Sequence, residues 1–259
     1  MPKFAANLSL MFAHLDFPDR VKAARDCGFK AVECLFPYAW PAEVLAAALR
    51  EHGLALVLHN LPPGDWDKGE RGMACDPARG DEFRAGVAMA AQYANALGVK
   101  RLHCLAGLLP PGVTPQAARA CYIENLRHAA RVLAPDGMAL LIEPINTFDM
   151  PGYFLTGSDQ AADIIAACAE PNLFMQFDMY HLQRMGEDVG AALRRHLPLI
   201  GHMQLADVPG RHEPGTGEMD YPALFQLIDA LGYDGWIGCE YHPLGDTAAG
   251  LRWLRKCQP

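Results

Sequence analysis

The feature that most constrains the fold of this 259-residue chain is the regular return of short apolar runs along it. Each run is followed by a polar turn and then by an amphipathic stretch that often ends at a glycine. This pattern is typical of parallel β-strands connected by helices. Eight runs are predicted to be strands, at residues 4–8, 31–35, 54–59, 101–105, 138–143, 173–178, 200–205 and 236–240.

Helical spacing is clearest before the fourth predicted strand. Phe83, Val87 and Leu97 belong to a set of apolar residues on one helical face, and Gly98 follows them as the expected C-cap. Eight strands alternating with eight helices in about 250 residues predict a single (β/α)8 TIM-barrel domain over residues 1–259. An open doubly wound α/β sheet has similar local signals, but no Gly-x-Gly-x-x-Gly sequence stands at a strand-to-helix turn.

Composition narrows the classes of partner. The 22 Lys and Arg residues against 30 Asp and Glu residues leave a net charge of −8, which disfavours binding to a nucleic acid backbone. No apolar run approaches the roughly 20 residues that span a bilayer, and the first residues lack the pattern of a signal peptide. The eight cysteines form no Cys-x-x-Cys pair. We therefore expect a cytoplasmic enzyme with reduced thiols and no membrane or nucleic acid partner; homo-oligomer formation stays open.

Four of the predicted strands end at polar residues, namely Glu143, Asp178, Gln204 and Glu240. In either architecture, ligands bind at the carboxyl ends of parallel strands. One such residue alone is as often a helix cap or a solvated loop residue, and a buried amide often only satisfies backbone groups. Three carboxylates at one point, however, need a cation or shared protons. The hard oxygen donors predict that these four residues bind a divalent metal, Mg²⁺ or Mn²⁺, whose necessity for activity stays open.

Other polar residues near the strand ends are candidates for binding a substrate. His181 follows Asp178 by three positions and His59 closes the third predicted strand, although either histidine could be structural. The loop at residues 61–72 is either a lid, whose arginine can pair with an acidic substrate, or a solvated loop. A second loop at residues 207–218 offers an arginine and a histidine. The candidate substrate-binding residues are His59, Glu70, Arg71, His181 and Arg211, with His212 as an alternative to Arg211 and with Asn7 and Glu33 as weaker candidates.

Six distinctive stretches are spread over nearly the whole chain. They are FAANLS at residues 4–9, LHNLPPGDW at 58–66, GERG at 69–72, IEPIN at 142–146, HEPGTGE at 212–218 and GWIGCEY at 235–241. These stretches resemble bacterial hydroxypyruvate isomerases. More broadly, the chain is similar to the xylose-isomerase-like TIM barrels, which include tagatose and psicose epimerases and endonuclease IV.

The resemblance implies an isomerase that exchanges a carbonyl and a hydroxyl group between hydroxypyruvate and tartronate semialdehyde, as in glyoxylate metabolism. It implies that Glu143 and Glu240 are the catalytic acid/base pair, acting through a metal-stabilised enediolate. It also implies that the metal ligands are Glu143, Asp178, Gln204 and Glu240. In the related sugar epimerases a histidine occupies the position of Gln204.

Three alternatives follow from the same residues. The nearest is isomerisation of a four-carbon 2-oxo acid such as 2-oxo-tetronate, or of a related small sugar, although the IEPIN and Asp65-Trp66 segments favour hydroxypyruvate. An endonuclease IV-like DNA repair enzyme would need a histidine-rich site for several zinc ions, which the four strand ends do not offer. A non-catalytic binding barrel is the third, but intact carboxylates at the strand ends argue against it.

Overall fold

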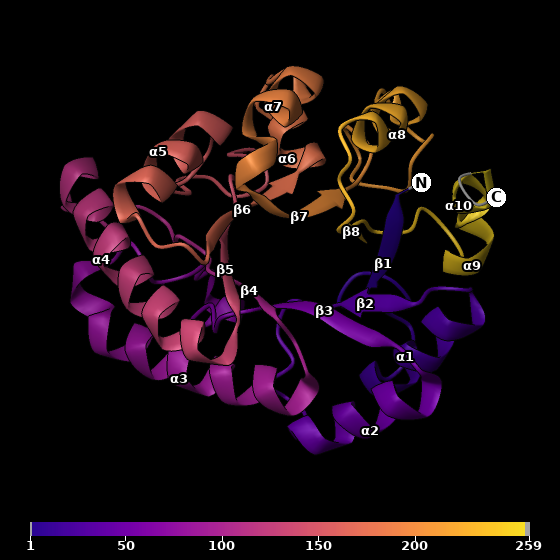
Figure 1. Ribbon diagram of the computed structural model, residues 1–259, viewed down its shortest axis with the longest axis horizontal. Coiled ribbons are helices and arrows are strands. Elements are labelled where there is room, and N and C mark those ends of the chain that lie inside the picture. The colour runs from indigo at the N-terminus through magenta and orange to yellow at the C-terminus, as the bar shows by residue number, and fades with distance from the viewer. Residues whose placement is uncertain (1, 257–259) are drawn as a thin grey trace.

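The computed structural model describes residues 2–256 and contains a closed barrel of eight parallel strands (Figure 1). The strands follow one another around the barrel in chain order, and β1 pairs with β8 to close it. Each strand overlaps one predicted run, so the predicted TIM-barrel fold is confirmed and the open sheet is excluded. The strands are β1 Lys3–Asn7, β2 Ala31–Glu33, β3 Ala55–Asn60, β4 Arg101–His103, β5 Ala139–Ile142, β6 Leu173–Asp178, β7 Ile200–Leu205 and β8 Trp236–Cys239.

Helices surround this barrel (Figure 1). The α-helices are α1 Phe17–Asp26, α2 Ala42–His52, α3 Gly80–Leu97, α4 Pro115–Leu133, α5 Ser158–Cys168, α6 Met179–Arg184, α7 Val189–His196, α8 Tyr221–Ala230, α9 Thr247–Gly250 and α10 Arg252–Lys256. Four short 3-10 helices among the described residues are η1 Trp66–Lys68, η2 Pro77–Arg79, η3 Ala134–Asp136 and η4 Leu197–Leu199.

The α3 helix forms as its apolar spacing predicts. Phe83, Val87 and Leu97 are buried on the face that packs into the core. Gly98 takes a left-handed conformation with φ 71°, and its N–H bonds to the carbonyl oxygen of Ala94. A left-handed residue satisfies the last carbonyl groups of a helix and stops it, and glycine adopts that conformation without a Cβ penalty.

Two of the eight expected helical segments are divided in the structure. After β6, the short helix α6 is followed by Gly186, with φ 80°, which turns the chain away from the helix. Asp188 then caps α7 by accepting a hydrogen bond from the N–H of Ala191 at 2.9 Å. After β8, α9 and α10 share the position of one longer helix. A stop followed at once by a new N-cap explains the division after β6.

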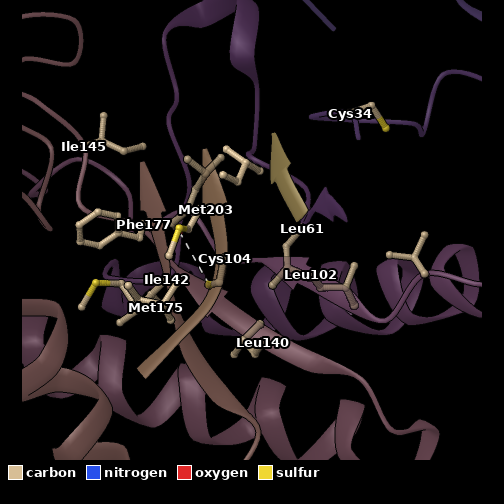
Figure 2. Packing of buried hydrophobic residues seen from close by; sticks show 14 of the residues in the cluster. Cys34, Leu61, Leu102, Cys104, Leu140, Ile142, Ile145, Met175, Phe177 and Met203 are labelled. Atoms are coloured by element: carbon tan, nitrogen blue, oxygen red, sulfur yellow. Dashed lines mark hydrogen bonds between the residues drawn. The ribbon is translucent and has the colours of Figure 1, made fainter. Parts of the chain in front are cut away.

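Side chains on the outward face of the strands form the main core. Leu140, Ile142 and Met175 belong to this core, which fills the space between strands and helices (Figure 2). Cys104 packs there as a small apolar residue, and burial raises the pKa of its thiol.

The side chains on the inward face of the strands change from apolar to polar along the barrel axis. Ala5, Ala31 and Leu141 form a second, smaller apolar cluster. Side chains two positions apart on a strand share a face. Two positions further along β1 and β2 lie the buried polar residues Asn7 and Glu33. A polar layer therefore lies above an apolar layer, towards the carboxyl ends of the strands.

Within residues 2–256, no helix combines the length and the apolar character needed to cross a bilayer.

Candidate active site

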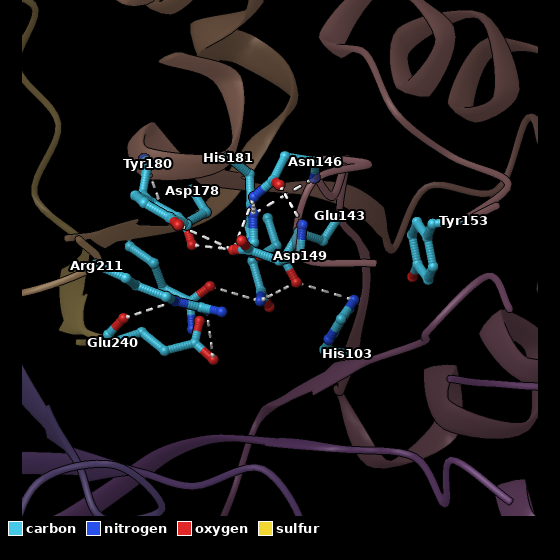
Figure 3. Close-up of polar contacts among 12 residues, drawn as sticks. His103, Glu143, Asn146, Asp149, Tyr153, Asp178, Tyr180, His181, Arg211 and Glu240 are labelled. Atoms are coloured by element: carbon cyan, nitrogen blue, oxygen red, sulfur yellow. Dashed lines mark hydrogen bonds and ion pairs between the residues drawn. The ribbon is translucent and has the colours of Figure 1, made fainter. Parts of the chain in front are cut away.

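Three buried carboxylates occupy the carboxyl ends of β5, β6 and β8. Glu143 directly follows β5, Asp178 is the last residue of β6, and Glu240 directly follows β8. Their side chains are 4%, 0% and 7% exposed. Figure 3 shows them with Arg211 and His181 around a shared space. Charges removed from water to this extent must be compensated by partners, by protonation or by a cation.

Asp178 serves both its helix and the site. Its Oδ1 accepts a hydrogen bond of 2.9 Å from the N–H of Tyr180 and so caps α6. Its Oδ2 is buried and has no hydrogen-bond partner within residues 2–256. Burial raises the pKa of Asp178 to about 6, against the lowering effect of Arg211. Asp178 therefore has both predicted roles: its Oδ1 caps the helix and its Oδ2 faces the site.

Glu143 is held through one of its two oxygens. Its Oε2 accepts a 3.0 Å hydrogen bond from Nε2 of Gln176 and lies 3.4 Å from Nε2 of His103. Its Oε1 has no hydrogen-bond partner among the described residues. Burial raises the pKa of Glu143 well above its usual range, and the charges of Glu240 and Asp178 raise it further. The carboxyl is therefore a proton acceptor of unusual basicity.

Glu240 pairs with Arg211. The Nη2 atom of Arg211 lies 3.5 Å from Oε1 of Glu240, and its Nε donates to the main-chain oxygen of Glu240 at 3.4 Å. Burial raises the pKa of Glu240 to about 8, although Arg211 counteracts the shift. Burial alone would lower the pKa of Arg211, but the three carboxylates together raise it. The guanidinium remains charged beside them.

The loop at residues 207–218 is ordered around the Asp207 carboxylate. Oδ2 accepts three backbone N–H groups, those of Gly215 at 2.8 Å, Thr216 at 3.1 Å and Gly217 at 3.0 Å. Arg211 has a left-handed φ of 55°, a conformation that costs energy in a non-glycine residue and points to a built feature. The loop therefore presents the arginine to the site as a fixed group.

His212 is turned to a different partner. Its Nδ1 lies 2.7 Å from the carbonyl oxygen of His242. Of the two residues considered from this loop, the structure brings Arg211, and not His212, beside Glu240.

Gln204 takes part in a hydrogen-bonded chain in the polar layer. Its Oε1 accepts from Nε2 of Gln176 at 2.7 Å, and its Nε2 donates to Oε1 of Glu33 at 2.8 Å. Glu33 also accepts from Nδ2 of Asn7 at 3.0 Å and lies 2.7 Å from Nε2 of His202. These bonds orient the amide with its oxygen towards Gln176, which in turn bonds Glu143.

His181 lies between the carboxylates and the loop that follows β5. Its Nε2 is 3.6 Å from Oδ2 of Asp178 and 3.9 Å from Oε1 of Glu143, and its Nδ1 is 2.7 Å from Nδ2 of Asn146. Burial lowers the pKa of His181 well below its usual range, with Arg211 adding to the effect. The imidazole is therefore neutral.

Ligand atoms of Glu143, Asp178 and His181 lie within 4.8 Å of one another. Glu143 and Asp178 are both buried, and each has one oxygen without a hydrogen-bond partner among the described residues. Oxygen donors left without protein partners in a buried site fit a hard divalent cation. The arrangement can therefore hold a metal, while the identity of that metal does not follow from the donors alone.

His59 lies at the carboxyl end of β3. Its Nδ1 is 3.2 Å from the carbonyl oxygen of Asn60 and 3.4 Å from the hydroxyl of Tyr38. Its Nε2 is buried and has no hydrogen-bond partner in the described part of the chain. Burial lowers the pKa of His59 to about 4, so the ring is neutral. Nε2 is available to a ligand.

The polar residues of the loop at 61–72 bond chiefly to their own neighbourhood. Glu70 is 2.8 Å from Nη1 of Arg79 and accepts a 2.6 Å hydrogen bond from the N–H of Asp65. Arg71 stacks over the Trp66 ring at 4.0 Å and donates to the carbonyl oxygens of Trp66 and Glu70 at 3.0 and 2.7 Å. Substrate contacts by Glu70 and Arg71 stay predictions.

Several residues around the site were not among the predicted ones. Gln176, His103 and His202 lie inside strands and point into the barrel, and Asn146 and Tyr180 lie just beyond β5 and β6. The signal for Gln176 and His202 is strand alternation, because each stands two positions before a strand-end site residue. No comparable signal marks Asn146.

Residues 21–257 of the chain match the protein family described as xylose isomerase-like TIM barrel.

Proteins of named function match over nearly the full length. The chain is 50% identical over 255 residues to a 2-oxo-tetronate isomerase of Cupriavidus necator, with 98% of each chain covered. It is 48% identical over 254 residues to a hydroxypyruvate isomerase of Escherichia coli, again with 98% of each covered.

Solved structures agree on the fold. A structure from Brucella melitensis described as AP endonuclease, family 2, matches with a TM-score of 0.97 and 44% identity over 100% of both chains. A D-psicose 3-epimerase from Clostridium cellulolyticum H10 matches with a TM-score of 0.81 over 99% of both chains, at 16% identity, which shows the shared fold alone.

Proposed function

Because the chain belongs to the xylose isomerase-like TIM barrel family, we propose that it interconverts hydroxypyruvate and tartronate semialdehyde by moving a proton between neighbouring carbons. The observation that carries this proposal is the pair of buried glutamates, Glu143 and Glu240, with a neutral histidine and a charged arginine beside them. Relatives that match nearly the whole chain are named as isomerases of small oxo acids.

The reaction requires two proton transfers at adjacent carbons. In hydroxypyruvate, the hydroxymethyl carbon C3 stands beside the carbonyl carbon C2. Removal of a proton from C3 gives an enediolate. Return of a proton to C2, together with movement of a proton from the C3 oxygen to the C2 oxygen, gives the aldehyde with no net change in atoms.

Glu143 and Glu240 suit these transfers because both are basic carboxyls in a buried site. One of them removes the C3 proton and the other supports or completes its return. Raised pKa values make each carboxylate, once it is ionised, a stronger base than an exposed glutamate, and make each carboxyl able to return a proton near neutral pH. General acid–base catalysis of this kind contributes roughly 10²–10⁴-fold to the rate.

Neighbouring residues bind the substrate and its developing charge. Arg211 is a charged, rigidly held group beside Glu240 and can pair with the carboxylate or an oxygen of the substrate. His181 is neutral and can hydrogen-bond a substrate oxygen. Burial of the whole cluster excludes water and strengthens these interactions.

A divalent cation, Mg²⁺ or Mn²⁺, fits the site because Glu143 Oε1 and Asp178 Oδ2 are buried without hydrogen-bond partners among the described residues. Glu240 and the amide oxygen of Gln204 would complete the donors, since that oxygen accepts only one hydrogen bond here and retains a second lone pair. When bound, such an ion polarises a carbonyl and stabilises the negative charge of an enediolate.

The cellular setting follows the chemistry of the substrate. We place the activity in glyoxylate metabolism, and we place the protein in the cytoplasm. Buried free thiols such as Cys34 and Cys104 support a reducing compartment.

A second candidate is the isomerisation of 2-oxo-tetronate. The chain is 50% identical to an enzyme of that name, so sequence similarity does not separate the two substrates. The four-carbon acid offers the same carbonyl beside a hydroxyl-bearing carbon, and the two glutamates would perform the same transfers on it.

A DNA repair activity finds little support in the residues, despite the name carried by the Brucella structure. Within residues 2–256, one group of three metal-ligating side chains is present, and it includes a single histidine. The net charge of −8 also opposes binding to a phosphate backbone.

The test is a direct comparison of the two acids. The purified chain is incubated with hydroxypyruvate or 2-oxo-tetronate, with Mg²⁺, with Mn²⁺ or with a chelator, and product formation is followed by proton NMR. A larger kcat/KM for hydroxypyruvate supports the proposal, and the reverse order supports the second candidate. Turnover of neither acid in any of these conditions would contradict the proposal and support a non-catalytic binding barrel.

A further inference from the structure

Asn146 is a buried amide whose orientation is fixed by the backbone around it. Its Oδ1 accepts hydrogen bonds from the N–H groups of Phe148 at 3.0 Å and Asp149 at 2.8 Å. Backbone N–H groups only donate, so the amide oxygen must face them. The amide nitrogen Nδ2 therefore faces His181 and the carboxylate of Asp149, at 2.7 and 3.0 Å.

This orientation decides which ring nitrogen of His181 carries the proton. Nδ2 of Asn146 can only donate, and the N–H of Asn146 also points at Nδ1 of His181, at 3.4 Å. A neutral imidazole has one accepting and one donating nitrogen, so Nδ1 accepts and Nε2 carries the hydrogen. On its other side, Nε2 faces Oδ2 of Asp178 at 3.6 Å and Oε1 of Glu143 at 3.9 Å, which favour an N–H over a lone pair.

We infer that Asn146 is a positioning residue that holds His181 in the Nε2-protonated tautomer, so that the ring offers a hydrogen-bond donor, and not a metal ligand, to the three-carboxylate site. If so, Glu143, Asp178 and His181 do not contribute equally to a metal site. All three have ligand atoms close enough for one ion. Only the two carboxylates have lone pairs directed at it.

The catalytic consequence rests on the proposed function. An Nε2–H group aimed into the site can hydrogen-bond a substrate oxygen as negative charge develops on it. Removal of one such donor typically costs about 100-fold or more in kcat. The tautomer itself does not depend on which substrate the protein uses, so the two claims can fail separately.

Asp149 is the position at which hydrogen-bond donor and acceptor can be exchanged with Asn146, because the two side chains are hydrogen-bonded to each other. Asp149 Oδ2 accepts from Nδ2 of Asn146 and from the hydroxyl of Tyr180 at 2.9 Å. The double variant Asn146→Asp with Asp149→Asn keeps an oxygen for the two backbone N–H groups. It also exchanges donor and acceptor between the two side chains, and an acceptor then faces Nδ1 of His181.

The experiment reads the tautomer by ¹⁵N NMR of histidine-labelled, full-length protein at one neutral pH, with and without Mg²⁺. The His181→Gln variant assigns the signal by its loss. The wild-type protein is expected to show His181 protonated at Nε2, unchanged by saturating Mg²⁺. The double variant is expected to show protonation at Nδ1 and a kcat reduced about 100-fold, with a smaller change in KM.

Control variants distinguish an effect of Asn146 on the His181 tautomer from general damage to the fold. Asp149→Asn alone leaves Asn146 as donor and should keep the wild-type tautomer. Asn146→Ala, examined in case the double variant does not fold, should show a mixture of tautomers. Protonation at Nδ1 in the wild type, or loss of the Nε2 hydrogen on adding Mg²⁺, would overturn the inference, as would an unchanged tautomer in both Asn146 variants. A wild-type protein that shows the expected tautomer but isomerises neither acid refutes only the proposed function.

Discussion

Arg211 Nη2 lies 3.5 Å from Oε1 of Glu240, and the arginine that makes this contact has a left-handed backbone with φ 55°. The arginine counteracts the effect of burial on the pKa of Glu240. A single residue therefore adjusts the basicity of the glutamate and, under the proposed function, would also supply a cation for an acidic substrate. These two effects can be measured separately.

Arg211→Met should raise the pKa of Glu240, because burial would then act without an opposing positive charge. We expect the rise of kcat/KM with pH to move to higher pH, and kcat/KM at neutral pH to fall by about 100-fold, equivalent to about 2.7 kcal/mol. Arg211→Lys keeps the charge and should keep most of the pH profile. The pH dependence of kcat/KM for all three proteins is the measurement, and an unmoved profile in Arg211→Met would contradict the assignment.

Glu143→Gln and Glu240→Gln should each reduce turnover by about 10²–10⁴-fold, since an amide cannot take up the substrate proton. Neither change should unfold the metal-free protein, because each removes one of the mutually repelling buried carboxylates. Steady-state kinetics and thermal unfolding test both statements. The exposed Glu51→Gln serves as the matched control, and near-wild-type turnover in either site variant would remove that residue from the acid/base pair.

The strand-end residues could be predicted because their position follows from local patterns. An apolar run that stops at a carboxylate marks both the end of a strand and the mouth of a barrel, and Asp178 and Glu240 are found there as expected. His181 is carried to the same place by the first turn of α6. Local sequence was therefore sufficient to predict where these three residues lie.

The links between strands could not be predicted in the same way. Gln204 meets Glu33, 171 residues away in sequence, only because the barrel closes with a particular register. A register irregularity between Met175 and Gln176 helps to set which side chains of β6 face those of β7. Such irregularities depend on packing across the sheet, which a single sequence does not display.

The metal-free protein should lose stability as pH rises above about 6.5, the ordinary pKa of histidine. Burial raises the pKa of Glu240 to about 8 and that of Asp178 to about 6, so the folded state binds more protons than the unfolded state above their ordinary values. The contribution of these two carboxyls to stability is then greatest below those ordinary values and falls by up to about 1.4 kcal/mol per pH unit for each group as pH rises towards the shifted pKa. The buried histidines His59, His103 and His181, whose pKa values are lowered, oppose this trend only below about pH 6.5.

A divalent cation that binds the ionised carboxylates should reverse this loss. Thermal unfolding of chelator-treated protein, from about pH 6.5 to about pH 8, should show a falling Tm, and Mg²⁺ or Mn²⁺ should raise the Tm more at the higher pH. Glu240→Gln should flatten the metal-free profile. A metal-free Tm that rises over this range would show that these carboxylates are stabilised by other means.

Glu33 should be required both for stability and for the orientation of Gln204. Its buried carboxylate accepts from Asn7 and Gln204, and it fills the space that a Cβ at Gly238 would occupy. Glu33→Gln leaves one oxygen to serve Asn7, Gln204 and His202, so at least one of these contacts changes, which should cost about 1–3 kcal/mol and lower kcat by weakening the support of Gln204.

Gly238→Ala is the paired variant for this prediction, because it pushes against the same carboxylate without changing its charge. We expect it to destabilise the protein and to lower kcat in the same direction as Glu33→Gln, since both disturb the support of Gln204. Chemical denaturation and steady-state kinetics measure the two effects. If both variants lose stability but keep full kcat, Glu33 only fills the barrel interior, and the orientation of Gln204 does not depend on it.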